Sequence, residues 1–192
     1  MQNLTDFGDQ GVILPLFVLA ALAFTVAGWR RAALVWVFVV PATLLIVSFG
    51  KLYGLGCGAS LPEGWDLHSP SGHTASAALI GGGLAGLLLP IRRRMATALL
   101  CAAMSATLIG CSRLSLQMHS VTDVAAGAAI GIAGAYVLVW QAGVRPRPLR
   151  HLPLLGAILL MGALAFHGTH IPAESWIIGH AAVLWPSTLC RI

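Results

Sequence analysis

The sequence predicts an all-α integral membrane protein with six transmembrane helices, and three observations support this prediction. Hydrophobic residues make up 58% of the 192 residues and charged residues only 9%, against about 25% charged residues in soluble domains. The mean hydropathy is +0.87, so the folded chain would have too little polar surface for water. Apolar runs of roughly 17–25 residues, which is enough to cross a bilayer, are found at Gly11–Gly28, Ala32–Gly50, His73–Pro90, Met95–Cys111, Ser120–Trp140 and Leu152–Gly168.

The composition of these runs and of their connections favours one helical bundle. The chain has 22 glycines, and small residues let membrane helices pack closely. Short basic connections that contain proline, "GLLLPIRRR" and "VRPRPLRHLP", separate neighbouring runs. No basic residue precedes Arg30, so a cleavable signal is not expected at the first run. We therefore predict a single domain over residues 1–192, with no particular oligomeric state indicated.

The basic residues are distributed unevenly among the connections. Eight of the eleven Lys and Arg residues lie in the first, third and fifth connections: Arg30, Arg31, Arg92, Arg93, Arg94, Arg145, Arg147 and Arg150. The positive-inside rule assigns these connections to the cytoplasm. Both termini and the second and fourth loops then face outward, which is the periplasm in a Gram-negative cell. The net charge of +5 therefore reflects membrane orientation, and nucleic acid is not an expected partner.

Ionisable residues gather where the outward loops meet the predicted helices. Lys51 follows the second run, His73 begins the third, and Arg113 lies in the fourth loop. Ionisable side chains at membrane depth are costly and indicate functional sites. His119 and Asp123 are four residues apart at the start of a helix, so they share one face. The carboxylate can accept a hydrogen bond from one imidazole nitrogen, which leaves the lone pair of the other nitrogen for nucleophilic attack.

The sequence "PSGH", Pro70 to His73, is suited to binding an anion. A helix that begins there offers free backbone N–H groups, and Gly72 would let an anion approach the backbone. Ser71 supplies a hydroxyl donor and Lys51 a point charge, while the planar fork of Arg113 matches two phosphate oxygens. With one histidine as nucleophile and another as acid and base, these groups predict phosphoryl transfer.

Two other chemistries use the same residue types. His73, His119 and Asp123 could ligate zinc, but the cations Lys51 and Arg113 would repel a divalent ion, so neither metal nor cofactor is expected. A Ser-His-Asp hydrolase built on Ser71 or Ser112 lacks the Gly-x-Ser-x-Gly elbow. The remaining histidines are interpreted as loop, interfacial or solvated residues: His68, His151, His167, His170 and His180.

Two motifs resemble those of a known family. "PSGH", followed by Ser112-Arg113, five residues, His119, three residues and Asp123, resembles the second and third signature motifs of the type 2 phosphatidic acid phosphatase family. This family shares a superfamily with bacterial acid phosphatases and vanadium haloperoxidases. The resemblance implies a six-helix membrane phosphatase, with the site at the outer face, that works through a phosphohistidine and needs no metal.

The resemblance also implies roles for individual residues. His119 would be the nucleophile and Asp123 would orient it. His73 would act first as the general acid for the leaving group and then as the general base for water. The phosphate would be held by Ser71, the Gly72 amide, Arg113 and Lys51.

The first signature motif of the family is only partly present. In the family it reads Lys, six residues, Arg-Pro; here Lys51 matches, but Gly58 and Ala59 stand where Arg-Pro is expected. His68 and Arg191 are candidates for supplying the missing cation.

The expected activity is hydrolysis of a lipid phosphomonoester or diphosphate at the periplasmic face of the inner membrane. Candidate substrates are a polyprenyl diphosphate such as undecaprenyl diphosphate, phosphatidic acid, phosphatidylglycerol phosphate and a lipid A phosphate. Two alternatives remain: a lipid phosphotransferase that uses the same phosphohistidine, and a non-catalytic lipid-binding protein.

Two smaller features lie on the predicted outer side. Cys57 and Cys190 are both placed there, where a disulfide could form because that side is oxidising. The tail over residues 170–186 is predicted either to form an interfacial helix or to be a loop without a role.

Overall fold

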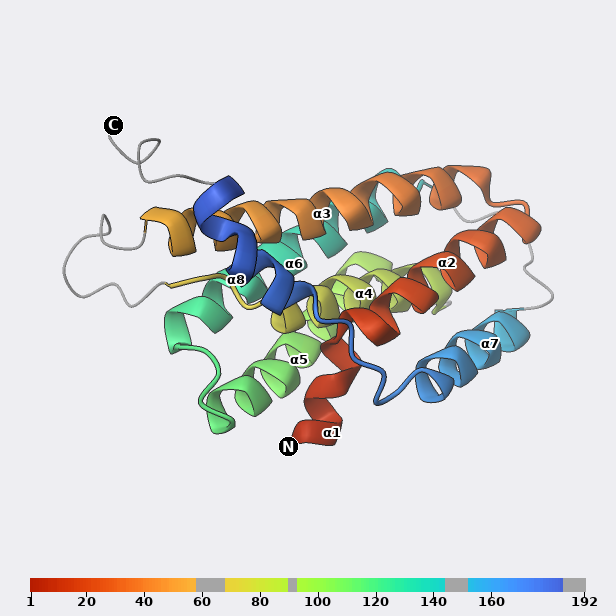
Figure 1. Cartoon of the computed structure of the whole chain (residues 1–192). Coiled ribbons are helices and arrows are strands. Elements are labelled where there is room, and N and C mark those ends of the chain that lie inside the picture. Colours follow the sequence, from red (N-terminus) through yellow and green to blue (C-terminus); the bar gives the residue numbers. More distant parts are fainter. Residues whose placement is uncertain (58–67, 90–92, 144–151, 185–192) are drawn as a thin grey trace.

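The computed structural model describes residues 1–57, 68–89, 93–143 and 152–184, and over these ranges the chain is helical without strands (Figure 1). It begins with two short elements and continues with seven helices: α1 (Gln2–Thr5), η1 (Asp6–Gly8), α2 (Gln10–Val26), α3 (Arg30–Cys57), α4 (Gly72–Leu88), α5 (Arg94–Ser115), α6 (Val121–Gln141), α7 (Leu152–Ala165) and α8 (Ala173–Leu184). The predicted all-α class is confirmed.

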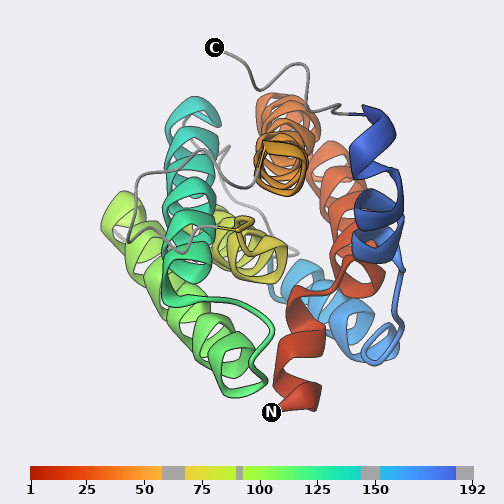
Figure 2. The same cartoon turned by 60° about the vertical axis from the view of Figure 1, so that its left-hand side comes forward.

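Helix α4 lies at the centre of the bundle (Figure 2). It packs against α5 and α6 over most of its length and also contacts α3, α2 and η1. Every residue from Thr74 to Ile80 is buried. Because several elements converge on α4, the residues at its first turn have neighbours from distant parts of the sequence.

Small residues allow the close packing of α4 with α6. A Cβ built at Gly131 would collide with the Ala75 carbonyl oxygen and would lie 2.8 Å from the Ala78 Cβ. A Cβ built at Gly127 would likewise collide with the Ser71 carbonyl oxygen. The backbones of the two helices therefore touch, in keeping with the role of small residues between membrane helices.

Gly131→Ala is expected to lower the free energy of unfolding by about 1–3 kcal/mol, because an extra methyl in a closely packed interface forces the backbone to shift. The measurement is the midpoint of thermal unfolding in detergent, followed by circular dichroism. Gly156→Ala on α7 is the matched control, since a Cβ built there meets nothing within 4 Å. Equal midpoints for the two variants would contradict the backbone contact between α4 and α6.

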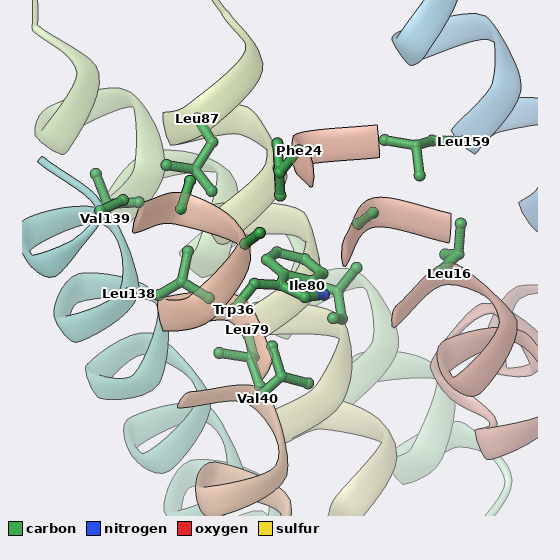
Figure 3. Packing of buried hydrophobic residues seen from close by; sticks show 14 of the residues in the cluster. Leu16, Phe24, Trp36, Val40, Leu79, Ile80, Leu87, Leu138, Val139 and Leu159 are labelled. Carbon is green, nitrogen blue, oxygen red and sulfur yellow. The ribbon is translucent and has the colours of Figure 1, made fainter. Parts of the chain in front are cut away.

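The larger apolar cluster among the described residues packs between α2, α3, α4 and α6 (Figure 3). Its central side chain is Trp36, which is fully buried and meets Phe24 edge-on with ring centroids 5.7 Å apart. Leu87 and Val139 contribute from the last turns of α4 and α6. The Trp36 indole N–H donates to the Phe17 carbonyl at 3.1 Å, so this buried N–H group has a hydrogen-bond partner.

Two arginines bind the carbonyls at the C-terminal end of α6. Arg31 Nε donates to the Gln141 carbonyl at 2.7 Å, and the Arg94 guanidinium donates to the Val139 and Gly143 carbonyls. Basic groups are favourable at this end because the last carbonyls have no partner within the helix. Since α6 has 21 residues and is about 30 Å long, these arginines lie at the opposite end of the bundle from residues 119–123.

Long apolar helices indicate a membrane protein. Within the described ranges, three helices are long and apolar enough to cross a bilayer: Arg30–Leu55, Arg94–Ser115 and Val121–Gln141. The N-terminal segment Gln2–Gly8 and α2 make a fourth if this pair, bent by 41°, is one span. With 17 residues α4 is shorter than these helices, as is α7 with 14. Six spans, the side of the membrane reached by each end and the division into domains stay predictions.

Several helix bounds differ from the predicted ones. Helix α3 continues six residues beyond Lys51 to Cys57, and α5 continues beyond Ser112 to Ser115. The glycines after Lys51 suggested a loop, but a Cβ built at Gly54 would collide with the His68 carbonyl oxygen. Gly54 therefore remains helical and allows the backbone of α3 to contact the backbone of His68. The short helices that precede α2 were not predicted.

The C-terminal tail forms a helix, α8, that packs against α3. The expectation of a helix within residues 170–186 is met, while its place at the membrane surface stays a prediction. The cysteine pairing falls outside the described residues, because the Cys57 side chain and Cys190 are not among them. The same holds for Gly58, Ala59 and Arg191.

Candidate functional site

The predicted histidine–carboxylate pair lies at the start of α6. His119 Nδ1 is 3.5 Å from Asp123 Oδ2, and the two side chains are 4% and 5% exposed. His119 precedes the helix and Asp123 is its third residue, so the pair spans the first turn. Nδ1 is therefore the ring nitrogen turned to the carboxylate, and the part of His119 as nucleophile stays a prediction.

Asp123 also fixes the segment that leads into α4. Its Oδ1 accepts hydrogen bonds from the backbone N–H groups of His68 and Ser69 at 3.0 and 2.9 Å. Its Oδ2 accepts from the Ser120 N–H at 3.1 Å, and the Ser120 hydroxyl accepts from the Asp123 N–H in return. This capping box matches the Ser-x-x-Asp sequence pattern. The bonds to residues 68 and 69 cross 55 and 54 positions, so no local sequence pattern indicates them.

Ser71 is the N-cap of α4. Its hydroxyl oxygen accepts a hydrogen bond from the Thr74 hydroxyl at 2.9 Å and a longer one from the Thr74 N–H. Its backbone N–H donates to the Asp123 carbonyl at 3.0 Å. The side chain is fully buried, so the structure gives Ser71 a capping role. Its predicted contact with phosphate stays a prediction.

Lys51 and His73 line one cavity of about 360 Å³, called here the Lys51 cavity, together with Gly72 and Asp9. Lys51 is 6% exposed, and its Nζ is 4.0 Å from the position that a Cβ of residue 72 would take. The predicted cation therefore lies beside the predicted amide at the start of α4. Apolar side chains from α2, α3 and the segment around α8 complete this cavity: Leu14, Leu44, Val47, Ile171 and Ile177.

Arg113 lines a second cavity of about 340 Å³, called here the Arg113 cavity, together with His73 and Asp9. Arg113 lies in the last turn of α5 and is 5% exposed. Thr5 and His170 also line this cavity. Because His73 and Asp9 line both cavities, His73 lies between the two predicted cations.

Asp9 was not predicted from the sequence as a residue of the site. Its Oδ2 is 3.5 Å from His73 Nε2 and 3.5 Å from His170 Nδ1. Its Oδ1 accepts from the Gly11 N–H at 2.7 Å and caps α2. An acidic residue just before an apolar run is a helix-start signal, but nothing in the spacing points to a partner 64 residues away.

The carboxyl of Asp9, which precedes α2, is held in its ionised form. Burial alone would raise its pKa, but hydrogen bonds from the Gly11 and Ile171 amides, the charge of His73 and a side-chain hydrogen bond with His170 lower the pKa below its ordinary value. Hydrogen bonds and positive neighbours favour a carboxylate over the neutral acid. Asp9 therefore presents a negative charge to His73 at neutral pH.

The structure thus brings Gly72, His73, Lys51, Arg113 and Asp123 together around the first turn of α4, whereas His119 lines neither the Lys51 cavity nor the Arg113 cavity. Gly72 and His73 belong to that turn, Lys51 and Arg113 line the cavities beside it, and Asp123 is hydrogen-bonded to the segment before it. His68 is exposed and takes part through its backbone N–H. Among the described residues no group of three or more His, Cys, Asp or Glu side chains is arranged to hold a metal ion.

Comparison with known proteins adds two matches. The profile of the PAP2 superfamily matches residues 53–147, which include Gly72, His73, Arg113, His119 and Asp123. A protein of Klebsiella pneumoniae described as "Uncharacterized 22.5 kDa protein in cps region" is 30% identical over 94% of this chain and 89% of its own length. No solved structure matches.

The profile match includes the two motifs that meet around the first turn of α4, and the similarity to the Klebsiella protein extends over nearly the whole of both chains. On these grounds the chain belongs to the PAP2 superfamily.

Proposed function

We propose that the protein is a metal-independent membrane phosphatase that hydrolyses a lipid phosphomonoester or diphosphate through a phosphohistidine. Membership of the PAP2 superfamily supports a phosphatase-type activity in general. The observation that carries the finer proposal is the buried pair of His119 and Asp123, 3.5 Å apart. A carboxylate on one imidazole nitrogen raises the nucleophilicity of the other nitrogen.

In the first step of the proposed reaction, His119 Nε2 attacks phosphorus, and the bond from phosphorus to the lipid oxygen breaks. His73 gives its proton to that leaving oxygen. In the second step, water attacks the phosphohistidine, the P–N bond breaks and His73 takes the proton from the water. The products are the lipid alcohol, or the lipid monophosphate from a diphosphate, and inorganic phosphate.

Lys51, Arg113 and the Gly72 amide are the proposed phosphate ligands. Fixed positive groups stabilise the charge that develops on the oxygens of a transferring phosphoryl group. Both cations are almost fully buried, and their attraction for an anion is stronger where water is excluded. The Ser71 hydroxyl is proposed as a further donor.

A lipid substrate is supported by the apolar surroundings of the Lys51 cavity. Leu14 and Ile171 line both this cavity and an adjoining groove of about 640 Å³. The other lining residues of the groove are also mainly apolar, among them Val18, Leu19 and Phe166. A cavity that holds charged groups and adjoins an apolar groove suits a molecule with a phosphate at one end and a hydrocarbon chain at the other.

The outer face of the inner membrane is proposed as the location of the site. Arg31 and Arg94 bind the end of α6 that lies farthest from His119 and Asp123. If these arginines face the cytoplasm, as the positive-inside rule requires, the site opens to the periplasm. Lipid phosphates of the outer leaflet would then reach it.

The proposed function is tested by measuring phosphate release by the purified protein from polyprenyl diphosphate, phosphatidic acid, phosphatidylglycerol phosphate and lipid A phosphate. At least one substrate is expected to release phosphate at a rate that EDTA does not change. Loss of the activity in EDTA and its return with zinc would contradict the metal-independent mechanism. Release of phosphate from none of the four, but transfer to an added acceptor lipid, would identify a phosphotransferase instead.

A further inference from the structure

The N-terminal segment is docked on the first turn of α4. The Ser76 hydroxyl donates to the Gly8 carbonyl at 2.8 Å. A Cβ built at Gly8 would lie only 2.8 Å from the His73 carbonyl oxygen and 3.1 Å from its Cα. Any side chain at residue 8 would push η1 away from α4. Glycine therefore permits the contact that brings the next residue, Asp9, to the His73 imidazole.

The two carboxylate oxygens of Asp9 have different partners. Oδ1 accepts hydrogen bonds from two backbone N–H groups, those of Gly11 at 2.7 Å and Ile171 at 3.3 Å. Oδ2 faces two imidazoles, His73 Nε2 at 3.5 Å and His170 Nδ1 at 3.5 Å. The backbone bonds fix the orientation of the carboxylate, and this orientation turns Oδ2 toward His73.

We propose that Asp9 is a positioning residue for His73: it holds the imidazole between the two cavities and favours its protonated form. The inference rests on the proposed function, in which His73 first gives a proton to the leaving oxygen. Asp9 and His73 then form a second aspartate–histidine pair beside that of Asp123 and His119.

The surroundings of His73 explain why such a carboxylate is needed. The charged and titratable groups around the first turn of α4 come from every element near it: Asp6 and Asp9 before α2, Lys51 on α3, Arg113 on α5, the His119–Asp123 pair at α6 and His170 before α8. Lys51 and Arg113 each line a cavity with His73, and nearby positive charge disfavours an imidazolium. A carboxylate 3.5 Å from the ring favours it, so Asp9 offsets the cations that bind the phosphate.

Asp9→Asn separates this role from the structural one. Asparagine is as good an N-cap as aspartate, and its one carbonyl oxygen can still accept from the Gly11 amide, so the cap is kept while the charge and the oxygen that faces His73 are lost. Without the Asp9 charge, the His73 ring is expected to lose its proton at lower pH. Turnover is therefore expected to fall about tenfold near pH 8, where the ring is then neutral, and less than about twofold near pH 6, where it is still protonated. The comparison variant is Asp6→Asn, which removes another buried carboxylate from the same segment, one that lies 4.0 Å from His170, and it is expected to lose less turnover near pH 8 than Asp9→Asn.

A loss of turnover that is equal at both pH values, or equal in Asp9→Asn and Asp6→Asn, would overturn the proposal. The second measurement is independent of activity: the titration of the His73 ring by NMR in histidine-labelled protein, with the signal assigned through His73→Gln. Its midpoint is expected at lower pH in Asp9→Asn than in wild type. An unchanged midpoint would overturn the pairing of Asp9 and His73, whatever the activity. If the His73 midpoint is lower in Asp9→Asn than in wild type, but the wild-type protein releases no phosphate from any substrate, only the proposed function is rejected.

Discussion

The His119→Ala variant is expected to release phosphate at least about 10⁴-fold more slowly than the wild-type protein, because loss of a nucleophile removes the covalent route entirely. The imidazole is nearly fully buried beside Asp123, and no solvent molecule would occupy its place with the same reactivity. The measurement is the rate of inorganic phosphate release, at saturating concentration, from the best of the four lipid substrates.

The matched control is His180→Ala on α8. His180 is exposed and stacks on Trp176 with ring centroids 4.5 Å apart, and we expect its replacement to leave phosphate release unchanged. Rapid quenching with ³²P-labelled substrate gives a second measurement, since a phosphohistidine is stable to alkali and labile to acid. We expect the wild-type protein to carry the ³²P label and the His119→Ala protein to carry none. A His119→Ala protein that keeps the wild-type rate would reject His119 as the nucleophile.

The local part of the site was predictable from the sequence. A histidine and an aspartate four residues apart at a helix start share a face whatever the rest of the fold does, and the structure has His119 and Asp123 3.5 Å apart. The start of α4 at Gly72 likewise follows from a Ser-Gly pair before an apolar run. Such inferences succeed because they depend on one helical turn.

The missed features depend on contacts between distant segments. Asp9 meets His73 only because Gly8 allows η1 to touch the backbone of α4. Helix α3 continues beyond Lys51, and Gly54 in this last part lets the helix lie against the carbonyl of His68. In both cases a glycine that locally suggests a turn instead permits close packing. The sequence shows the glycine but not its neighbour.

Asp123→Asn is expected to lower turnover by about 10²–10⁴-fold while the protein stays folded. Loss of the charge removes the group that holds His119 Nδ1–H, and the comparable change in a serine-protease triad costs about 10⁴. Asparagine has one oxygen where aspartate has two, so it can still accept from the amides of His68 and Ser69 but not also from the Ser120 amide. The measurements are phosphate release and the midpoint of thermal unfolding.

Two further variants separate the catalytic effect from the structural one. Asp123→Ala leaves all three backbone N–H groups without this acceptor and is expected to lower the free energy of unfolding by about 2–4 kcal/mol. Ser120→Ala removes the side-chain cap of α6 and the hydrogen bond between the Ser120 and Thr122 hydroxyls. The cost is expected to be about 1 kcal/mol, with turnover within about threefold of wild type. If Ser120→Ala instead lost as much turnover as Asp123→Asn, the carboxylate would act by capping α6 rather than by orienting His119. The order Ser120→Ala, Asp123→Asn, Asp123→Ala in decreasing turnover, with Asp123→Ala alone strongly destabilised, is the result that the two hydrogen-bonded oxygens of Asp123 predict.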